Sequence, residues 1–350
     1  MTPIRKGRDA AAVPVHSTRA RRPPGRAACV LFVAAVCLLL LRPVAAQSFV
    51  PGARIEMASV DGRLDHMDID LEGKRLFVAA LGANSVEVID LAAGRHIRRL
   101  QPFREPQGVL YLPSSKRLFI ANGAGGGVQA FADGKGSAVA AADALGDADN
   151  LRIRPAAKEL VVGYGHALAV LDTDTLRHVK RIELPGHPEG FAVVSTGVLA
   201  YVNVPSARQI VVVDLRIAKI TAAWDIVAAV QNFPIALDEQ SHRVLVATRR
   251  PALLLVWDTK TGKRVAELPI CGDADDLFFD SQRHQLYAIC GDGQIQVIRQ
   301  RDPDLYEIAE RVPTALGART GLFVPSLATL YVAVPSRGGA PAEIRTFHIR

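Results

Sequence analysis

Hydrophobic runs recur along this chain with a period of about 42 residues. Each copy holds short runs that are apolar throughout or alternate with polar positions, and turn residues separate the runs. The apolar residue that opens the second run of each copy serves as an anchor, and the seven anchors are Leu76, Leu118, Leu160, Ala200, Val244, Leu286 and Leu330. A repeat of fixed period predicts a series of like units, each burying its apolar face against the next.

The runs within a copy have the length of β-strands. In the fifth copy they cover residues 233–237, 243–248, 253–258 and 263–268, with turn residues between them. Four short strands joined by tight turns form an antiparallel meander. Seven such units, repeated radially, predict an all-β, seven-bladed β-propeller with four-stranded antiparallel blades.

The last copy contains only three such runs, at residues 321–324, 329–334 and 343–349. An additional run at residues 53–60 precedes the first complete copy. We expect this N-terminal strand to join the last blade and close the ring, because an open ring would leave unpaired strand edges and an uncovered blade face.

Four of the second runs share a distinctive pattern: Phe77-Val78-Ala79-Ala80, Phe119-Ile120-Ala121-Asn122, Tyr201-Val202-Asn203 and Tyr331-Val332-Ala333. Pro-x-Gly elements precede some copies, as at Pro106-Gln107-Gly108 and Pro188-Glu189-Gly190. In these motifs residues 53–350 resemble the YVTN-type β-propeller repeat family of exported, YncE-like proteins. The resemblance implies the propeller fold. It leaves the function open, because such propellers serve as binding modules, scaffolds and occasionally enzyme domains.

The first 46 residues differ in composition from the repeats. Seven basic residues precede an apolar run at 27–41, and Val44-Ala45-Ala46 stands before Gln47 as a small-residue cleavage site. This order is typical of a secretory signal peptide. We therefore expect a signal peptide at 1–46, a single propeller domain at 47–350, and a periplasmic or secreted protein that is not membrane-bound after cleavage. An uncleaved membrane anchor is the alternative.

The excess positive charge of the chain belongs to this N-terminal segment. Residues 1–46 hold eight of the 42 basic residues and one of the 35 acidic residues, so residues 47–350 carry 34 of each. A nucleic-acid-binding domain usually needs a clustered basic face. The neutral balance therefore makes nucleic acid an unlikely partner, and the Arg249-Arg250 pair is interpreted as solvated surface on a turn.

Two cysteines, Cys271 and Cys290, remain outside the N-terminal segment, and both belong to the sixth copy. The meander places them on the same face of the ring, and an exported protein favours pairing. A disulfide is therefore the first interpretation, and two separate buried thiols are the alternative.

Propellers place ligands at the mouth of the central channel, where the loops that enter the innermost strands converge. The positions ten and eleven residues before each anchor identify these loops. They predict a polar, mainly acidic ligand-binding ring made of Asp65, His66, Gln107, Asp149, Asn150, Glu189, Asp275, Asp276 and Arg319. Carboxylate and amide oxygens suit Ca²⁺, which is therefore a possible cofactor. The same side chains also suit a cationic or hydroxyl-rich small molecule.

Three functions remain open from the sequence. The leading hypothesis is a module that binds a small-molecule ligand or a protein partner at the channel mouth or on one ring face, as a monomer. The alternative is a metal-assisted hydrolase or lactonase, with His66 beside Asp65, Asp68 and Asp275 and with Arg319 stabilising an oxyanion. A further alternative is binding of single-stranded nucleic acid. No catalytic residue is assigned, because the chain lacks a Gly-x-Ser-x-Gly elbow, a P-loop and a His-Glu-x-x-His motif.

Overall fold

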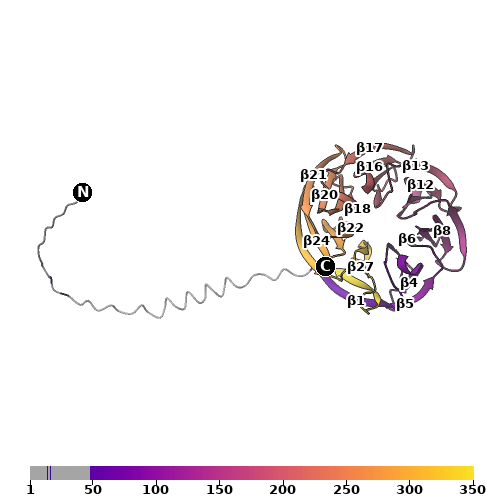
Figure 1. Ribbon diagram of the computed structural model, residues 1–350, viewed down its shortest axis with the longest axis horizontal. Helices are drawn as coiled ribbons and strands as arrows, with labels where there is room; N and C mark the ends of the chain where they lie inside the picture. The colour runs from indigo at the N-terminus through magenta and orange to yellow at the C-terminus, as the bar shows by residue number, and fades with distance from the viewer. Residues whose placement is uncertain (1–13, 15, 17–47) are drawn as a thin grey trace, which may run out of the picture. The chain divides into compact units, whose positions relative to one another are not determined.

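The computed structural model describes Pro14, His16 and residues 48–350. The predicted signal peptide therefore lies almost entirely outside the described residues. Residues 48–350 form seven four-stranded antiparallel sheets arranged as blades around a central axis (Figure 1). In each blade the first strand lies near the axis and the last lies at the periphery. The predicted all-β, seven-bladed propeller is confirmed.

The first three blades follow the chain order from the inside outward. Blade 1 is β2 (Met67–Asp70), β3 (Arg75–Ala80), β4 (Ser85–Asp90) and β5 (Arg95–Leu100); blade 2 is β6 (Pro106–Leu112), β7 (Arg117–Asn122), β8 (Gly127–Ala132) and β9 (Ala138–Asp143); blade 3 is β10 (Leu151–Arg154), β11 (Glu159–Tyr164), β12 (Ala167–Asp172) and β13 (His178–Glu183).

The next three blades have the same order. Blade 4 is β14 (Phe191–Val193), β15 (Leu199–Val204), β16 (Gln209–Asp214) and β17 (Lys219–Asp225); blade 5 is β18 (Val230–Asp238), β19 (Arg243–Arg250), β20 (Ala252–Asp258) and β21 (Lys263–Pro269); blade 6 is β22 (Ala274–Asp280), β23 (Gln285–Cys290), β24 (Gln294–Asp302) and β25 (Leu305–Pro313).

The seventh blade is assembled from both ends of the ring sequence. Its order is β26 (Thr320–Val324), β27 (Thr329–Val334), β28 (Ala342–Ile349) and β1 (Phe49–Met57). β1 pairs antiparallel with β28, from Phe49 opposite Ile349 to Met57 opposite Ala342. The N-terminal strand is thus the outermost strand of the last blade, and the predicted closure is confirmed.

The seven anchors explain why the period specifies this fold. Each anchor is the second residue of the second strand of its blade, and each is 0% exposed. These strands lie between the inner and outer strands and carry the apolar contacts from blade to blade. Apolar burial is the main driving force for folding, so a fixed anchor spacing directs the chain to the same sheet-on-sheet packing seven times.

The N-terminal strand begins earlier than the sequence predicted. We expected residues 53–60, whereas β1 runs from Phe49 to Met57. Pro51 weakens the sequence signal, because proline cannot donate a hydrogen bond to a neighbouring strand. As an outermost strand, β1 tolerates it, and its pairing with β28 shifts register between Pro51 and Arg54.

Short 3₁₀ turns connect some strands: η1 (Leu81–Ala83), η2 (Pro155–Ala157), η3 (Pro205–Ala207) and η4 (Pro325–Leu327). Within the part of the chain that the structure describes, no helix has the length and apolar character needed to cross a membrane.

Candidate functional site

A cavity of about 410 Å³ lies on the axis of the ring and is lined by residues of all seven blades. Most of its wall comes from the innermost strands and from the loops that lead into them. Of the nine predicted ring residues, seven line this cavity: Asp65, His66, Asp149, Asn150, Glu189, Asp275 and Asp276. The blade register therefore brings together side chains that are up to 211 positions apart in the chain.

Two of the predicted ring residues do not line the cavity. The side-chain amide of Gln107 lies 3.4 Å from Asp147 Oδ1. Arg319 lies 3.0 Å from Asp275 Oδ2 through Nε and 3.2 Å from Asp273 Oδ2 through Nη1. Both side chains therefore pair with neighbouring acidic groups.

The interpretation of Arg249 as solvated surface is wrong. Its side chain is only 16% exposed, and its Nη2 lies 2.6 Å from Asp275 Oδ1. Its guanidinium carbon also lies 4.3 Å from the centre of the Phe233 ring. The sequence predicted a strand that ends at residue 248, whereas β19 continues to Arg250 and therefore includes Arg249. It fixes Asp275 from the next blade.

The wall of the cavity has a second layer that was not predicted from the sequence. The residues eight positions before each anchor all line the cavity: Asp68, Leu110, Arg152, Ala192, Ala236, Phe278 and Leu322. Side chains alternate between the two faces of a strand, so these residues face the same way as the residues that stand ten positions before each anchor. Five of these seven residues are apolar, which gives the cavity an apolar wall beside its acidic ring.

His66 is surrounded by carboxylates of three blades. Its Nε2 lies 3.8 Å from Asp65 Oδ1 and 3.7 Å from Asp149 Oδ1, and its Nδ1 lies 3.9 Å from Asp276 Oδ1. Burial alone would lower the pKa of His66, but these three carboxylates outweigh burial and raise it. The three carboxylates therefore favour the protonated form of the imidazole.

Four of the six carboxylates that line the cavity have protein partners. Asp65 pairs with Arg63 at 2.7 Å, and Asp275 pairs with Arg249 and Arg319. Asp276 accepts a hydrogen bond from the backbone N–H of Gly321 at 2.7 Å, and Asp68 accepts one from Tyr111 at 2.6 Å. Burial raises the pKa of Asp276 and of Asp68 to about 6.

Asp149 and Glu189, which lead into neighbouring blades, are differently placed. Asp149 Oδ1 is buried and has no hydrogen-bond partner in the part of the chain that the structure describes, and the same holds for Oδ1 of the adjacent Asn150. Among the described residues, the Glu189 carboxylate has neither an ion pair nor a hydrogen bond. Burial raises the pKa of Asp149 to about 7, and Asp65 and Glu189 add to this rise. Burial, with Asp275 and Asp65, also raises the pKa of Glu189 to about 7.

The Pro-x-Gly elements have a packing role at this site. A Cβ atom on Gly108 would lie 2.1 Å from the backbone oxygen of Asp149. A Cβ atom on Gly190 would lie 2.5 Å from the backbone oxygen of Phe233, to which the Gly190 N–H donates a hydrogen bond. Only glycine permits this close approach. The elements thus set the positions of the neighbouring blade's channel residues.

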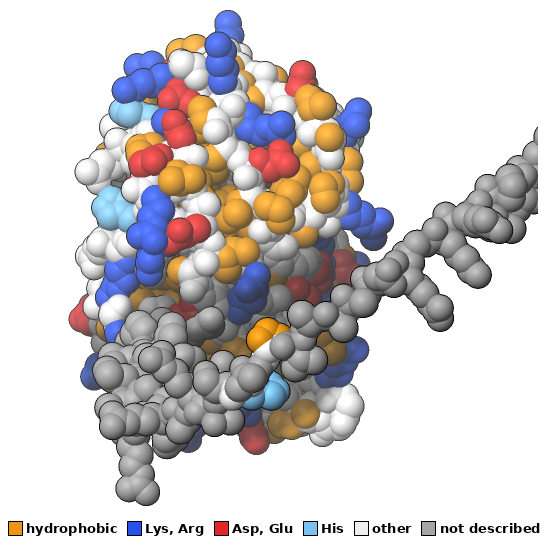
Figure 2. Space-filling model, turned by 90° about the vertical axis from the view of Figure 1, so that its left-hand side faces the viewer, with side chains coloured by type: hydrophobic (Ala, Val, Ile, Leu, Met, Phe, Trp, Pro, Cys, Tyr) orange, Lys and Arg blue, Asp and Glu red, His pale blue; other side chains and the backbone are white. Residues whose placement is uncertain are grey.

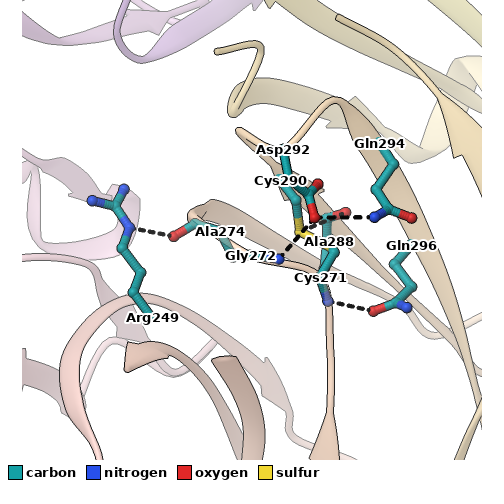
Figure 3. The surroundings of a disulfide bond; sticks show 9 residues. All are labelled: Arg249, Cys271, Gly272, Ala274, Ala288, Cys290, Asp292, Gln294 and Gln296. Carbon is teal, nitrogen blue, oxygen red and sulfur yellow. Dashed lines mark hydrogen bonds between the residues drawn. A yellow bond between two sulfur atoms is a disulfide. The ribbon is translucent and has the colours of Figure 1, made fainter. Parts of the chain in front are cut away.

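The structure joins Cys271 and Cys290 in a disulfide, with their Cα atoms 5.9 Å apart (Figure 3). Cys271 stands three residues before β22, and Cys290 ends β23. The backbone N–H of Cys271 donates to Gln296 Oε1 at 2.9 Å, and that of Gly272 donates to Asp292 Oδ2 at 3.0 Å. The disulfide thereby anchors the segment that supplies Asp273, Asp275 and Asp276 to the channel mouth.

The described residues contain one group of three acidic, histidine or cysteine side chains whose ligand atoms all lie within 4.8 Å of one another. That group is Cys271, Cys290 and Asp292, in which both sulfurs belong to the disulfide. The channel carboxylates are farther apart than a compact metal site requires. The geometry therefore gives no specific support to Ca²⁺ or to a metal-assisted hydrolase.

Basic and acidic side chains are interspersed on the outer face of the ring that Figure 2 shows. Such mixing differs from the clustered basic surface that binds nucleic acid through its phosphates.

Comparison with known proteins supports the fold. No family model matches the chain, and no curated protein matches it. Many solved structures match the chain, and two of them illustrate the shared fold. Hydrazine synthase of Kuenenia stuttgartiensis has a TM-score of 0.69 and 16% identity over 79% of this chain and 94% of that chain. A chain of the mitotic checkpoint complex has a TM-score of 0.72 and 12% identity over 97% of this chain and 98% of that chain. At these identities the similarity shows the propeller fold alone.

Proposed function

We propose that this protein is a binding module, with membership in the YVTN-type repeat family, and that its ligand enters the central cavity. The observation that carries this proposal is that Asp149 and Asn150 both line the cavity and that each has a buried acceptor oxygen with no partner among the described residues. Buried polar atoms are normally hydrogen-bonded, because an unsatisfied one costs about 1–3 kcal/mol. A ligand that donates hydrogen bonds would satisfy both.

The build of the cavity also favours binding. Its volume of about 410 Å³ lies within the range of small-molecule sites. Seven blades hold its wall, so the polar groups are positioned before the ligand arrives, which reduces the entropic cost of binding.

The test is a thermal-shift screen of the purified protein against small amines, carboxylates, amino acids and sugars. We expect at least one class to raise Tm, and we expect Ala192→Trp, which fills the cavity, to remove this shift. Val179→Trp, at an exposed position of the outer strand β13, is the matched control and should retain it. A protein that none of the four classes stabilises, or a shift that persists in Ala192→Trp, contradicts the proposal.

A protein partner on a ring face is the second candidate. It is supported by the similarity to a chain of the mitotic checkpoint complex, a protein assembly that contains the same fold. The Ala192→Trp variant separates the two candidates. A filled cavity blocks a small ligand, whereas it leaves the outer surface of the ring unchanged.

We also propose that the protein is exported with cleavage after Ala46. The basic segment, the apolar run at 27–41 and the small residues before Gln47 support this proposal, and so does the disulfide, because disulfides persist in oxidising compartments. We expect the protein recovered outside the cytoplasm to begin at Gln47 by N-terminal sequencing. Recovery of the exported protein with residues 27–41 still attached would instead support an uncleaved anchor.

A further inference from the structure

We infer that the ligand of the central cavity is a primary alkylammonium ion, with its charged head at Asp149, Asn150 and Glu189 and its apolar chain along the inner wall. This inference rests on the proposed binding function and adds the chemical class of the ligand. Three observations carry it: the unpartnered acceptors, the balance of charge, and the apolar layer.

The unpartnered acceptors require hydrogen-bond donors. Asp149 and Asn150 are 6% and 3% exposed, and each has a buried Oδ1 atom that forms no hydrogen bond with any described residue. An ammonium group has three donors and no acceptor, so it can satisfy both oxygens and still reach a third acceptor. Glu189, which also lines the cavity and has no partner among the described residues, is available as that acceptor.

The charge balance favours a cation at this position. Arginines or backbone N–H groups already hold Asp65, Asp68, Asp275 and Asp276. His66 lies 3.7 Å from Asp149, which is too long for a hydrogen bond. Arg63, Arg152 and His187 act on Asp149 through charge alone, because none of them donates a hydrogen bond to it among the described residues. A metal ion fits less well, because Ca²⁺ takes six to eight oxygen ligands and the compact three-residue group found among the described residues lies at the disulfide.

The apolar layer of the wall favours a ligand that carries an alkyl chain beside its ammonium group. Five apolar residues line the same cavity, each eight positions before the anchor of its blade: Leu110, Ala192, Ala236, Phe278 and Leu322. A methylammonium ion would leave this surface uncovered, whereas a longer alkyl chain covers it. Each methylene transferred from water to such a surface strengthens binding about fourfold.

Binding should also depend on pH. Asp149 faces His66, Asp65, Glu189, His187, Arg63 and Arg152. Glu189 faces Asp275, His66, Asp65, Arg249 and Arg63. Both carboxyl groups have a pKa of about 7, so they are mostly neutral at pH 6 and ionised at pH 8. Protonation of His66 at low pH acts in the same direction, because it adds positive charge near the ammonium. An alkylamine, like lysine, stays protonated throughout this range.

The experiment is isothermal titration calorimetry of the purified protein with n-butylamine, methylamine, 1-butanol and CaCl₂ at pH 6 and pH 8. At pH 8 we expect n-butylamine to bind at least about tenfold more tightly than methylamine. We expect no measurable binding of 1-butanol or Ca²⁺. Between pH 8 and pH 6 the n-butylamine affinity should fall about tenfold for each carboxylate that must ionise.

Two variants test the head-group contacts directly. Asp149→Asn and Glu189→Gln should each weaken n-butylamine binding about tenfold and flatten its pH dependence. Glu183→Gln, an exposed carboxylate at the end of the outer strand β13, is the matched control and should change neither. Glu189 is half-buried, so its variant tests the inference even if Asp149→Asn disturbs folding.

The outcomes distinguish this inference from the proposed function. Equal binding of 1-butanol and n-butylamine, tighter binding of Ca²⁺, or unchanged amine affinity in both variants would overturn the alkylammonium assignment. If the cavity takes sugars or carboxylates but no amine, the binding function stands and this assignment fails. If no compound binds in a way that Ala192→Trp abolishes, the binding function and the alkylammonium assignment both fail.

Discussion

Deletion of residues 47–62 is expected to abolish the cooperative thermal unfolding of the ring. These residues include β1, which pairs with β28 along its length and completes the seventh blade. Without β1, β28 would become an exposed outer edge, and the outer surfaces of blades 6 and 1 beside it would lose their cover. A propeller depends on closure, because each blade covers its neighbours.

The apolar side chains of this segment set the size of the effect. Phe49, Ile55, Met57 and Val60 are each no more than 3% exposed. At about 1.5–3 kcal/mol for each buried apolar side chain, their removal forfeits roughly 6–12 kcal/mol. Folded domains are stable by about 5–15 kcal/mol, so the loss approaches the whole margin.

These side chains reach both neighbours of the seventh blade. Phe49 packs edge-on against Tyr287 of blade 6, with ring centres 5.1 Å apart. Ile55 and Met57 belong to the apolar cluster that contains Leu76 of blade 1. β1 therefore packs against the blades on both sides of the seventh blade, where the two ends of the ring sequence meet.

Differential scanning calorimetry of the deleted and intact proteins measures this prediction. Phe49→Ala is a smaller change in the same strand and should lower the free energy of unfolding by about 3–5 kcal/mol. Glu56→Ala, an exposed position on the same strand, is the control and should leave Tm nearly unchanged. A deleted protein that melts cooperatively at the original Tm would show that β1 does not close the ring.

The fold was predictable from the sequence because one signal is repeated seven times. A single apolar run of six residues does not distinguish a strand from part of a buried helix. Seven runs at near-constant spacing do, and each anchor from Leu76 to Leu330 proved fully buried. The start of β1 was less predictable, since Pro51 and Gly52 interrupt its pattern and an outermost strand tolerates them.

The candidate site was predictable only as far as the repeat register extends. The register located Asp149 and Asn150, and the alternation of strand side chains would also have located Arg152. It could not locate the contacts of Arg249, whose partners Asp273 and Asp275 belong to the next blade. The ion-pair partners of a long side chain depend on how neighbouring blades pack, and the repeat register of a single sequence does not specify this packing.

Replacement of both Cys271 and Cys290 by serine is expected to lower the stability of the ring by about 3 kcal/mol, because the disulfide closes a loop between positions 19 residues apart. The same segment leads to Asp275, which holds Arg249 and Arg319. The loss should therefore also loosen the acidic mouth of the channel. We expect a lower Tm and earlier proteolysis within residues 271–276.

Redox titration provides an independent measurement of the same bond. Denatured protein should show free thiols only after reductant, and reduced protein should melt at the temperature of the double serine variant. Reductant should leave the Tm of that variant unchanged, which is the control for effects elsewhere in the chain. Equal thiol counts in denatured protein with and without reductant would show that the bond does not form. A bond that forms but leaves Tm unchanged when reduced would mean that Gln296 and Asp292, which accept the backbone N–H groups of Cys271 and Gly272, hold the segment without it.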